Sequence, residues 1–166
     1  MQSAVSSPDQ QKVSMAVEIL KTSGSLRFAA RGYSMLPALW PGDVLTIQAV
    51  PWQSLNSGDV VLYTREGRLY AHRVLRRMTT SDGESIVVRG DSMPRADRPV
   101  LAEELLGRVK LVERDGHVLP GIPRCTPLTR LAGLVLCWDR LRSVVLRLRT
   151  TLRPASGAIS SESFSL

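Results

Sequence analysis

Cysteine, histidine and lysine are scarce in this chain of 166 residues, which has two cysteines and two histidines. Cys125 and Cys137 give neither a disulfide framework nor the spacing of a metal site, so we expect free thiols in a reducing compartment. No lysine lies between Lys21 and Lys110. A catalytic base in the middle of the chain would therefore have to be another kind of residue. We expect neither a metal ion nor a cofactor.

Long apolar runs are also missing. No stretch reaches the roughly 18 apolar residues that a transmembrane helix needs. Residues 1–30 lack the apolar core of a secretory signal peptide. These features predict a cytoplasmic protein, or one bound at most to the surface of a membrane.

Aromatic residues make up only 5% of the chain, while its formal net charge is +7. A basic balance suits nucleic acid, anionic lipid or simple solubility and does not choose among them. The sequence contains no nucleic-acid recognition motif, and so few aromatic side chains do not suit a platform for stacking bases. We therefore expect no specific nucleic-acid partner.

Glycine and proline divide the region 25–120 into short apolar segments, which predicts a mainly β domain. The expected strands cover 26–30, 44–50, 60–64, 68–77, 85–89, 105–113 and 117–119. Asp82-Gly83 and Asp115-Gly116 are typical of hairpin turns. Ahead of this domain, residues 1–24 predict a loose tail and a short helix that ends at Gly24.

Residues 121–152 form a different segment, in which a proline-rich linker precedes a helical pattern. Between 128 and 152, apolar residues recur on one face and arginines flank that face. Such a basic amphipathic helix can lie on lipid, so one interpretation is peripheral membrane contact through this segment. The other is a helix packed on the β domain or on a second subunit. Residues 153–166 are rich in serine and predict a disordered tail.

The segment 31–43 places a serine in a turn beside apolar residues. Ser34 follows Gly32, which tolerates backbone angles that larger residues resist, and precedes Pro37, which favours an extended preceding residue. Tyr33 and Met35 flank the serine. Such a turn can hold a hydroxyl rigidly at the edge of an apolar surface, although serine is also common in ordinary turns.

A serine hydroxyl is a poor nucleophile near neutral pH and needs a base within hydrogen-bonding reach. Only His72 and His117 can supply an imidazole, which titrates in the range that suits this role. His72 lies within an apolar strand pattern, whereas His117 adjoins an expected turn and is more typical of the surface. A histidine in a strand can also be purely structural.

The segment 88–97 offers two carboxylates, Asp91 and Asp97, on an expected loop. Either could orient an imidazole and stabilise its charged form, which is the third role in a Ser-His-Asp arrangement. Loop aspartates also commonly cap turns. The residues alone therefore leave both interpretations open.

Five motifs occur in an order that resembles the type I signal peptidase superfamily, which also contains self-cleaving repressors of the LexA type. The motifs are Gly-x-Ser-Met-x-Pro-x-Leu-x-x-Gly-Asp, Gly-Asp-Val-Val, His-Arg-Val, Gly-Asp with a later Asp, and Gly-Arg-Val. The resemblance extends over about residues 26–112. It implies a signal-peptidase/LexA-like β fold and a serine peptidase.

The segment around His72 is similar to that of the ER, archaeal and sporulation-type signal peptidases, in which the base is a histidine followed by Arg-Val. In that group an aspartate seven residues after the loop glycine completes the site, and counting from Gly90 leads to Asp97. The resemblance thus implies Ser34 as nucleophile, His72 as base and Asp97 as the group that orients it. Asp91 is also a recurrent position of the site and is expected to hold the loop in shape.

The expected substrate-binding residues are Gly32, Tyr33, Met35 and Pro37, because peptides of this family bind in extended form beside the nucleophile segment and the histidine strand. Many signal peptidases have a serine in place of Gly32, and its hydroxyl helps to form the oxyanion hole. Here the hole would rest on backbone amides such as that of Ser34. From the sequence we also expect no amino-terminal membrane anchor of the kind that most signal peptidases possess.

The resulting hypothesis is a serine endopeptidase that processes a leader or signal-like segment of a peptide or protein precursor. Self-cleavage of the LexA type is the nearest alternative, but only 33 residues precede Ser34 and no Ala-Gly pair occurs among them. The alternative from another class is a non-catalytic peptide-binding module with the same fold. The retention of the serine, the histidine and both aspartates argues against that module.

Overall fold

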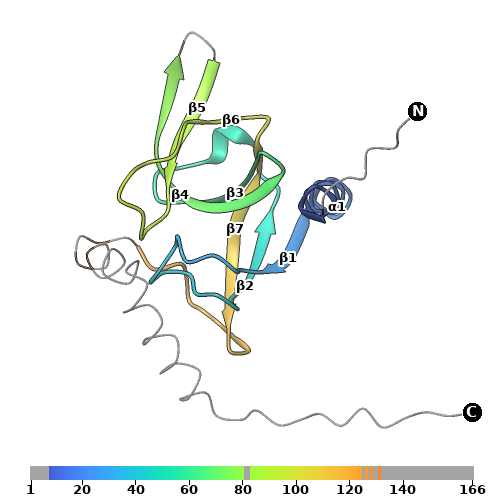
Figure 1. Cartoon of the computed structure of the whole chain (residues 1–166), viewed down its shortest axis with the longest axis vertical. Helices are drawn as coiled ribbons and strands as arrows, with labels where there is room; N and C mark the ends of the chain where they lie inside the picture. Colours follow the sequence, from blue (N-terminus) through green and yellow to red (C-terminus); the bar gives the residue numbers. More distant parts are fainter. Residues whose placement is uncertain (1–7, 81–82, 125, 127, 129–130, 132–166) are drawn as a thin grey trace, which may run out of the picture.

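One helix and one curled antiparallel sheet make up the computed structural model, which describes residues 8–80, 83–124, 126, 128 and 131 (Figure 1). The mainly β fold expected from the sequence is confirmed. The elements are α1 (Pro8–Ser23), β1 (Ser25–Ala29), β2 (Val44–Gln48), the 3₁₀ turn η1 (Trp52–Ser54), β3 (Val60–Arg65), β4 (Arg68–Thr80), β5 (Gly83–Arg89), β6 (Val100–Leu101), β7 (Leu105–Arg114) and β8 (His117–Val118).

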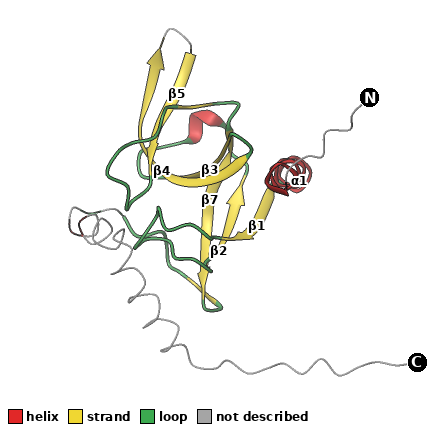
Figure 2. Ribbon diagram, in the orientation of Figure 1, coloured by secondary structure: helices red, strands yellow, loops and turns green. Residues whose placement is uncertain are grey.

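The strand order is β1-β2-β7-β3-β4-β5-β6, with β8 paired to β7. Strand β7 is therefore the central connection of the sheet, because it lies between β2 and β3 although it comes late in the chain (Figure 2). It joins the β1–β2 pair, which carries the Ser34 turn, to the β3–β6 strands, which carry His72. The two halves of the expected site thus meet through a long-range pairing.

Two-residue turns fix the register of the hairpins. Glu66 and Gly67 connect β3 to β4 with φ angles of 52° and 71°, which is the geometry of a type I′ turn. The hairpin expected at Asp115-Gly116 joins β7 to β8 in the same way, with φ angles of 51° and 80°. Strands β4 and β5 form the hairpin expected at Asp82-Gly83, although Asp82 lies outside the described residues.

Strand β3 is buried on both faces, and each face belongs to a separate apolar cluster. Val60 and Leu62 pack with residues of β2 and β7 and with Leu20 of α1. Val61 and Tyr63 pack with residues of β4, β5 and β6. Full burial of an apolar side chain of this size contributes about 1.5–3 kcal/mol, so the two clusters make β3 a rigid support for the strand beside it.

Helix α1 and strand β6 show where the sequence was informative and where it was not. The helix ends where Gly24 has a φ of 69° and its amide donates to the Leu20 carbonyl, as the sequence predicts. Strand β6 has only two residues and follows Pro99, so it gives no alternating pattern and was not expected. Within the described chain, no helix is long and apolar enough to pass through a lipid bilayer.

The segments predicted at the carboxyl end lie almost wholly outside the described residues. Only residues 128 and 131 of the expected amphipathic helix 128–152 are described, and none of the expected tail 153–166. The helix, its membrane contact and the division of the chain into four parts therefore stay predictions.

Candidate active site

Three segments that lie far apart in the sequence bring Ser34, His72 and Asp97 into one hydrogen-bonded series. Ser34 lies on the turn between β1 and β2, His72 on β4, and Asp97 on the connection from β5 to β6. The Ser34 Oγ atom is 2.9 Å from Nε2 of His72. On the other side of the ring, Nδ1 of His72 contacts Oδ2 of Asp97. This arrangement is the one that activates a serine hydroxyl.

The turn that carries Ser34 is held by its own buried residues. Met35 and Leu36 are 4% and 1% exposed, and the Leu39 amide donates to the Met35 carbonyl at 2.9 Å. These contacts anchor the apolar side of the turn in the core while Ser34 stays partly accessible. The hydroxyl therefore lies at the edge of an apolar surface.

The 90–92 loop clamps the other side of the Ser34 turn. The Ser92 amide donates to the Ser34 carbonyl at 3.0 Å, and its hydroxyl donates to the Tyr33 carbonyl at 2.8 Å. Gly90 packs so closely that an added Cβ would lie 2.4 Å from the Ser34 carbonyl oxygen. Glycine is thus required there by close approach of two backbones.

Tyr63 is a member of the site that the sequence analysis missed. Its hydroxyl donates to Oδ2 of Asp97 at 2.9 Å and lies 3.2 Å from Nδ1 of His72. The two-residue turn after β3 could have revealed it. That turn pairs Tyr63 with Tyr70, and Tyr70 points to the same face of β4 as His72 because the two are separated by one residue.

The electrostatics around the partly buried Asp97 favour its ionised form. Burial raises the pKa of this carboxyl, but the hydrogen bond and charge of His72 and the Tyr63 hydroxyl lower it further, so the pKa lies below its usual value. Burial and the nearby Asp97 charge raise the pKa of Tyr63. The phenol therefore stays protonated and donates to the carboxylate.

Arg65 holds the loop that presents Asp97. Its guanidinium binds both carboxylate oxygens of Glu104, at 2.9 and 2.7 Å. It also donates to the carbonyls of Arg98 and Pro99, the two residues that follow Asp97. Because four contacts converge on one planar group, the position of the carboxylate is fixed from strand β3.

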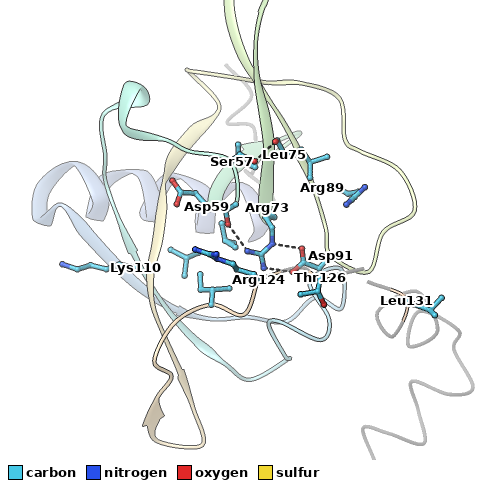
Figure 3. Close-up of a pocket in the computed structure, with 15 residues that line it drawn as sticks. Ser57, Asp59, Arg73, Leu75, Arg89, Asp91, Lys110, Arg124, Thr126 and Leu131 are labelled. Carbon is cyan, nitrogen blue, oxygen red and sulfur yellow. Dashed lines mark hydrogen bonds and ion pairs between the residues drawn. The ribbon is translucent and has the colours of Figure 1, made fainter. Parts of the chain in front are cut away.

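Asp91, proposed as a catalytic candidate from the sequence, does not contact His72. It forms a bidentate ion pair with Arg73 at 2.9 and 2.7 Å, and both residues are buried (Figure 3). Successive side chains of a strand point to opposite faces, so Arg73 directs its partner away from the ring of His72. The contact of His72 is with Asp97.

Arg73 also ties three segments of the chain together. Beyond Asp91, it donates to the carbonyls of Gly58 and Pro123 at 2.9 and 2.8 Å. Gly58, Arg73 and Asp91 line a surface cavity of about 930 Å³ (Figure 3). The 90–92 loop that clamps Ser34 is thereby fixed to strand β4 and to the proline-rich segment.

A cavity of about 300 Å³ opens beside Ser34 and His72. Of the expected substrate-binding residues, Gly32, Tyr33 and Met35 line it, whereas Pro37 does not. The Pro37 carbonyl instead accepts a hydrogen bond from the Trp40 indole at 2.8 Å. The remaining lining is mostly apolar and comes from Phe28, Ala30, Leu39, Leu45, Leu62, Leu69, Tyr70 and Ala71, with Arg31 as its one charged member among the described residues apart from His72.

His117 lies at a hairpin turn, as the sequence suggested. It belongs to β8, is exposed, and its Nδ1 atom is 2.9 Å from the Asp115 carbonyl oxygen. It takes no part in the series of contacts around Ser34.

Comparison with models of protein families gives no match. Among curated proteins, the chain is similar to two that are named inactive signal peptidase IA, from Staphylococcus aureus strains Mu50 / ATCC 700699 and N315. In both cases the identity is 30% over 95 residues, which is 52% of this chain and 52% of the relative. The chain thus spans about half the length of the curated relatives it matches. This similarity and the β fold together suggest a signal peptidase-like protein.

Proposed function

We propose that this chain is a serine endopeptidase of the signal peptidase type, with Ser34 as nucleophile, His72 as general base and Asp97 as the group that orients it. The observation that carries the proposal is the unbroken series of contacts from Ser34 Oγ through both ring nitrogens of His72 to Asp97. A serine in an ordinary turn needs no such series. The expected substrate is a peptide or protein precursor from which a leader or signal-like segment is removed.

In the proposed reaction, Ser34 Oγ attacks the scissile carbonyl carbon while His72 Nε2 accepts the hydroxyl proton. When the tetrahedral intermediate collapses, the same imidazolium gives that proton to the leaving amine. A water molecule, deprotonated by His72, then hydrolyses the acyl-enzyme. Asp97 stabilises the charged ring in each step, and Tyr63 keeps the carboxylate in place.

The backbone near Ser34 suits the oxyanion hole that this reaction needs. Within the described chain, the Ser34 amide makes no hydrogen bond. An amide donor that is already free and fixed by the surrounding turn can stabilise a developing oxyanion without first losing another partner. Gly32 contributes no hydroxyl, so the donors proposed here are backbone groups.

Two strand edges flank the cavity and support extended binding of a peptide. Among the described strands, β1 pairs only with β2, and residues 68–72 of β4 pair only with β3. Phe28 and Ala30 line the cavity from the first edge, and Tyr70 and His72 line it from the second. A peptide that entered between these edges could hydrogen-bond to one or both of them and present its carbonyl to Ser34.

A peptide-binding module without catalytic activity is the second candidate, and one observation favours it. The curated relatives carry the word inactive in their name. The geometry around Ser34 favours catalysis instead, because it has a base within hydrogen-bonding reach of the hydroxyl. The two candidates share the same groove and differ only in turnover.

Peptide cleavage separates the two candidates. We would incubate a library of peptides that have small residues before the scissile bond with the wild-type chain, Ser34→Ala and His72→Ala, and identify products by mass spectrometry. Ser54→Ala and His117→Ala are matched controls, because both residues are exposed and lie outside the cavity. The proposal expects cleavage by the wild type and both controls only. Cleavage that survives in Ser34→Ala would refute it, and binding without any cleavage would favour the module.

A further inference from the structure

Arg31 brings a positive charge to the cavity that holds Ser34. Among the described residues, the lining of this cavity of about 300 Å³ contains no carboxylate that could neutralise the charge. Arg31 is the third residue before Ser34, and a Cβ added to the intervening Gly32 would lie 4.0 Å from the Ser34 Oγ atom. The unneutralised charge thus belongs to the immediate surroundings of the proposed nucleophile.

The guanidinium of Arg31 is available to a ligand. Arg31 is exposed, and within the described chain it makes no hydrogen bond and no ion pair. Arg65, Arg73 and Arg114 differ from it, because each of them binds a carboxylate of the chain itself. A guanidinium can bind a carboxylate through two parallel hydrogen bonds. Arg31 can therefore make with another molecule the kind of contact that these three arginines make within the fold.

Positive charges outnumber negative ones in the surroundings of Arg31. A second cavity, of about 590 Å³, lies beside α1, β1 and the start of β4, and Arg31 lines it together with Lys12, Arg27 and Arg68. The one acidic residue in its described lining is Asp9, which forms an ion pair with Lys12 at 2.9 Å. Arg27 pairs with a glutamate on β7, whereas Arg31 and Arg68 form no ion pair within the described chain. A segment with negative charge would be attracted here, and a basic one repelled.

We propose that Arg31 is a specificity-determining residue that binds a carboxylate of the substrate close to the scissile bond. This inference rests on the proposed function and adds to it the class of substrate. Arg31 and Ser34 line one cavity, and an extended chain advances about 3.3 Å per residue, so the carboxylate should lie within about three residues of the cut. Its source is either an acidic side chain or the free carboxyl end of a peptide.

The test measures binding to the Ser34→Ala chain, which lacks the proposed nucleophile, and so does not depend on turnover. The probes are amidated peptides of alanine, serine and glycine that carry an uncharged dye. Glutamate, glutamine or lysine is placed in turn at each of the three positions on either side of a central Ala-Ala bond. A second set ends one to three residues after that bond, as the free acid or as the amide. Fluorescence anisotropy gives the Kd of each peptide.

At one position at least, the peptide with a carboxylate is expected to bind about 5-fold more tightly than its neutral counterpart, and the lysine peptide more weakly than both. Adding Arg31→Gln should remove this preference. Adding Arg31→Glu should reverse it, so that the lysine peptide binds best, which a merely structural role of Arg31 would not produce. The matched control is Arg124→Glu, at an exposed arginine that lines neither cavity. It changes the net charge of the chain equally and should leave the order of affinities intact.

Equal or undetectable binding of the acidic and neutral peptides in both sets would overturn the proposal. It would also be overturned if Arg31→Gln weakened binding of all peptides by the same factor, or if Arg124→Glu reversed the preference as Arg31→Glu does. A preference confined to the free acids of the second set would support the proposal and assign the carboxylate to the end of the peptide. If the preference holds but the wild-type chain cleaves no peptide, only the proposed peptidase activity fails.

Discussion

The Tyr63 hydroxyl donates a hydrogen bond to the Asp97 carboxylate at 2.9 Å, and Tyr63 itself is only 2% exposed. A buried phenol that donates to a carboxylate fixes one of its oxygens and leaves less freedom for the imidazole bound to it. The series of contacts that begins at Ser34 thus ends on β3, a strand buried on both faces, and not at a solvated loop.

Tyr63→Phe is expected to keep the fold and weaken the site. The ring still stacks on Tyr70, with 5.5 Å between centroids, but one hydrogen bond to Asp97 is lost. A hydrogen bond to a charged group is worth about 1.5–3 kcal/mol, so kcat/KM should fall roughly 10- to 100-fold. The phenol helps to lower the pKa of Asp97, so its removal raises that pKa. The loss of activity at acidic pH should then begin at a higher pH than in the wild type, whereas an unchanged pH profile would contradict this role.

Asp97→Asn should abolish most activity without unfolding the chain. The amide is close to isosteric but can neither stabilise an imidazolium nor fix the tautomer of His72, and losses of about 10⁴-fold are typical for this change. Rates on a cleaved peptide, with circular dichroism as a check of folding, would measure the effect. Activity within 10-fold of the wild type would show that the His72 ring is oriented by another group.

Removing one partner of the ion pair between Arg73 and Asp91 should destabilise the fold more than replacing both partners with apolar residues. Arg73→Met or Asp91→Leu alone leaves a buried charge without a partner and should cost about 3–5 kcal/mol in the free energy of unfolding. The double variant should cost less than either single change. Urea unfolding of the three variants measures this, and additive losses would mean that the two groups act independently.

Gly90→Ala should displace the nucleophile. The added methyl would meet the Ser34 carbonyl oxygen at 2.4 Å and Ser34 Cβ at 3.0 Å, so the two loops must move apart at a cost of about 1–3 kcal/mol. Cleavage should fall together with thermal stability. Gly121→Ala is the control, because an added Cβ there has no neighbour within 4 Å among the described atoms. If both variants had the same cleavage rate and thermal stability, the close approach of Gly90 to the Ser34 backbone would not be needed.

Glu104→Gln should reduce stability only where the carboxylate is ionised. The hydrogen bonds from Arg65 are the main cause that lowers the pKa of Glu104 below its ordinary value of 4.5. A group whose folded pKa is depressed contributes stability above the unfolded pKa, and that contribution is lost as the pH falls through the folded pKa. The difference in unfolding free energy between wild type and variant should therefore be largest near neutral pH and shrink below about pH 4.5. Glu103→Gln, at an exposed position, should show no such trend.

Local signals in the sequence account for most of the fold. Gly-Asp pairs predicted where strands begin, and Asp-Gly pairs predicted the hairpin turns between strands. Each expected strand is present, with ends that differ by a few residues. Strand β6 was missed because two residues after a proline carry no pattern. The order of the strands in the sheet could not be predicted from the sequence either. The position of β7 between β2 and β3 depends on pairing between segments far apart in the chain.

The candidate site could also be predicted only in part from the sequence. Ser34, His72 and Asp97 could be proposed from motifs that each stand on one segment. The contact of Tyr63 with Asp97 joins two segments 34 residues apart, and a tyrosine in a strand is ordinary. The partner of Asp91 could not be predicted either. In the sequence Arg73 is one of many arginines, and its contact with Asp91 depends on the face of β4 on which it lies.

The two strand edges beside Ser34, which have no further partner among the described strands, also bear on how copies of the protein meet. Unpaired amides and carbonyls invite any extended chain, including a second copy of the same protein, so an open edge is a risk of aggregation. Strand β1 limits that risk by having only five residues, and Arg31 and Arg68 line the cavity beside β1 and the start of β4 with like charges. If the proposed function holds, arginines at this border would discourage pairing between copies while leaving the edges accessible to a substrate peptide.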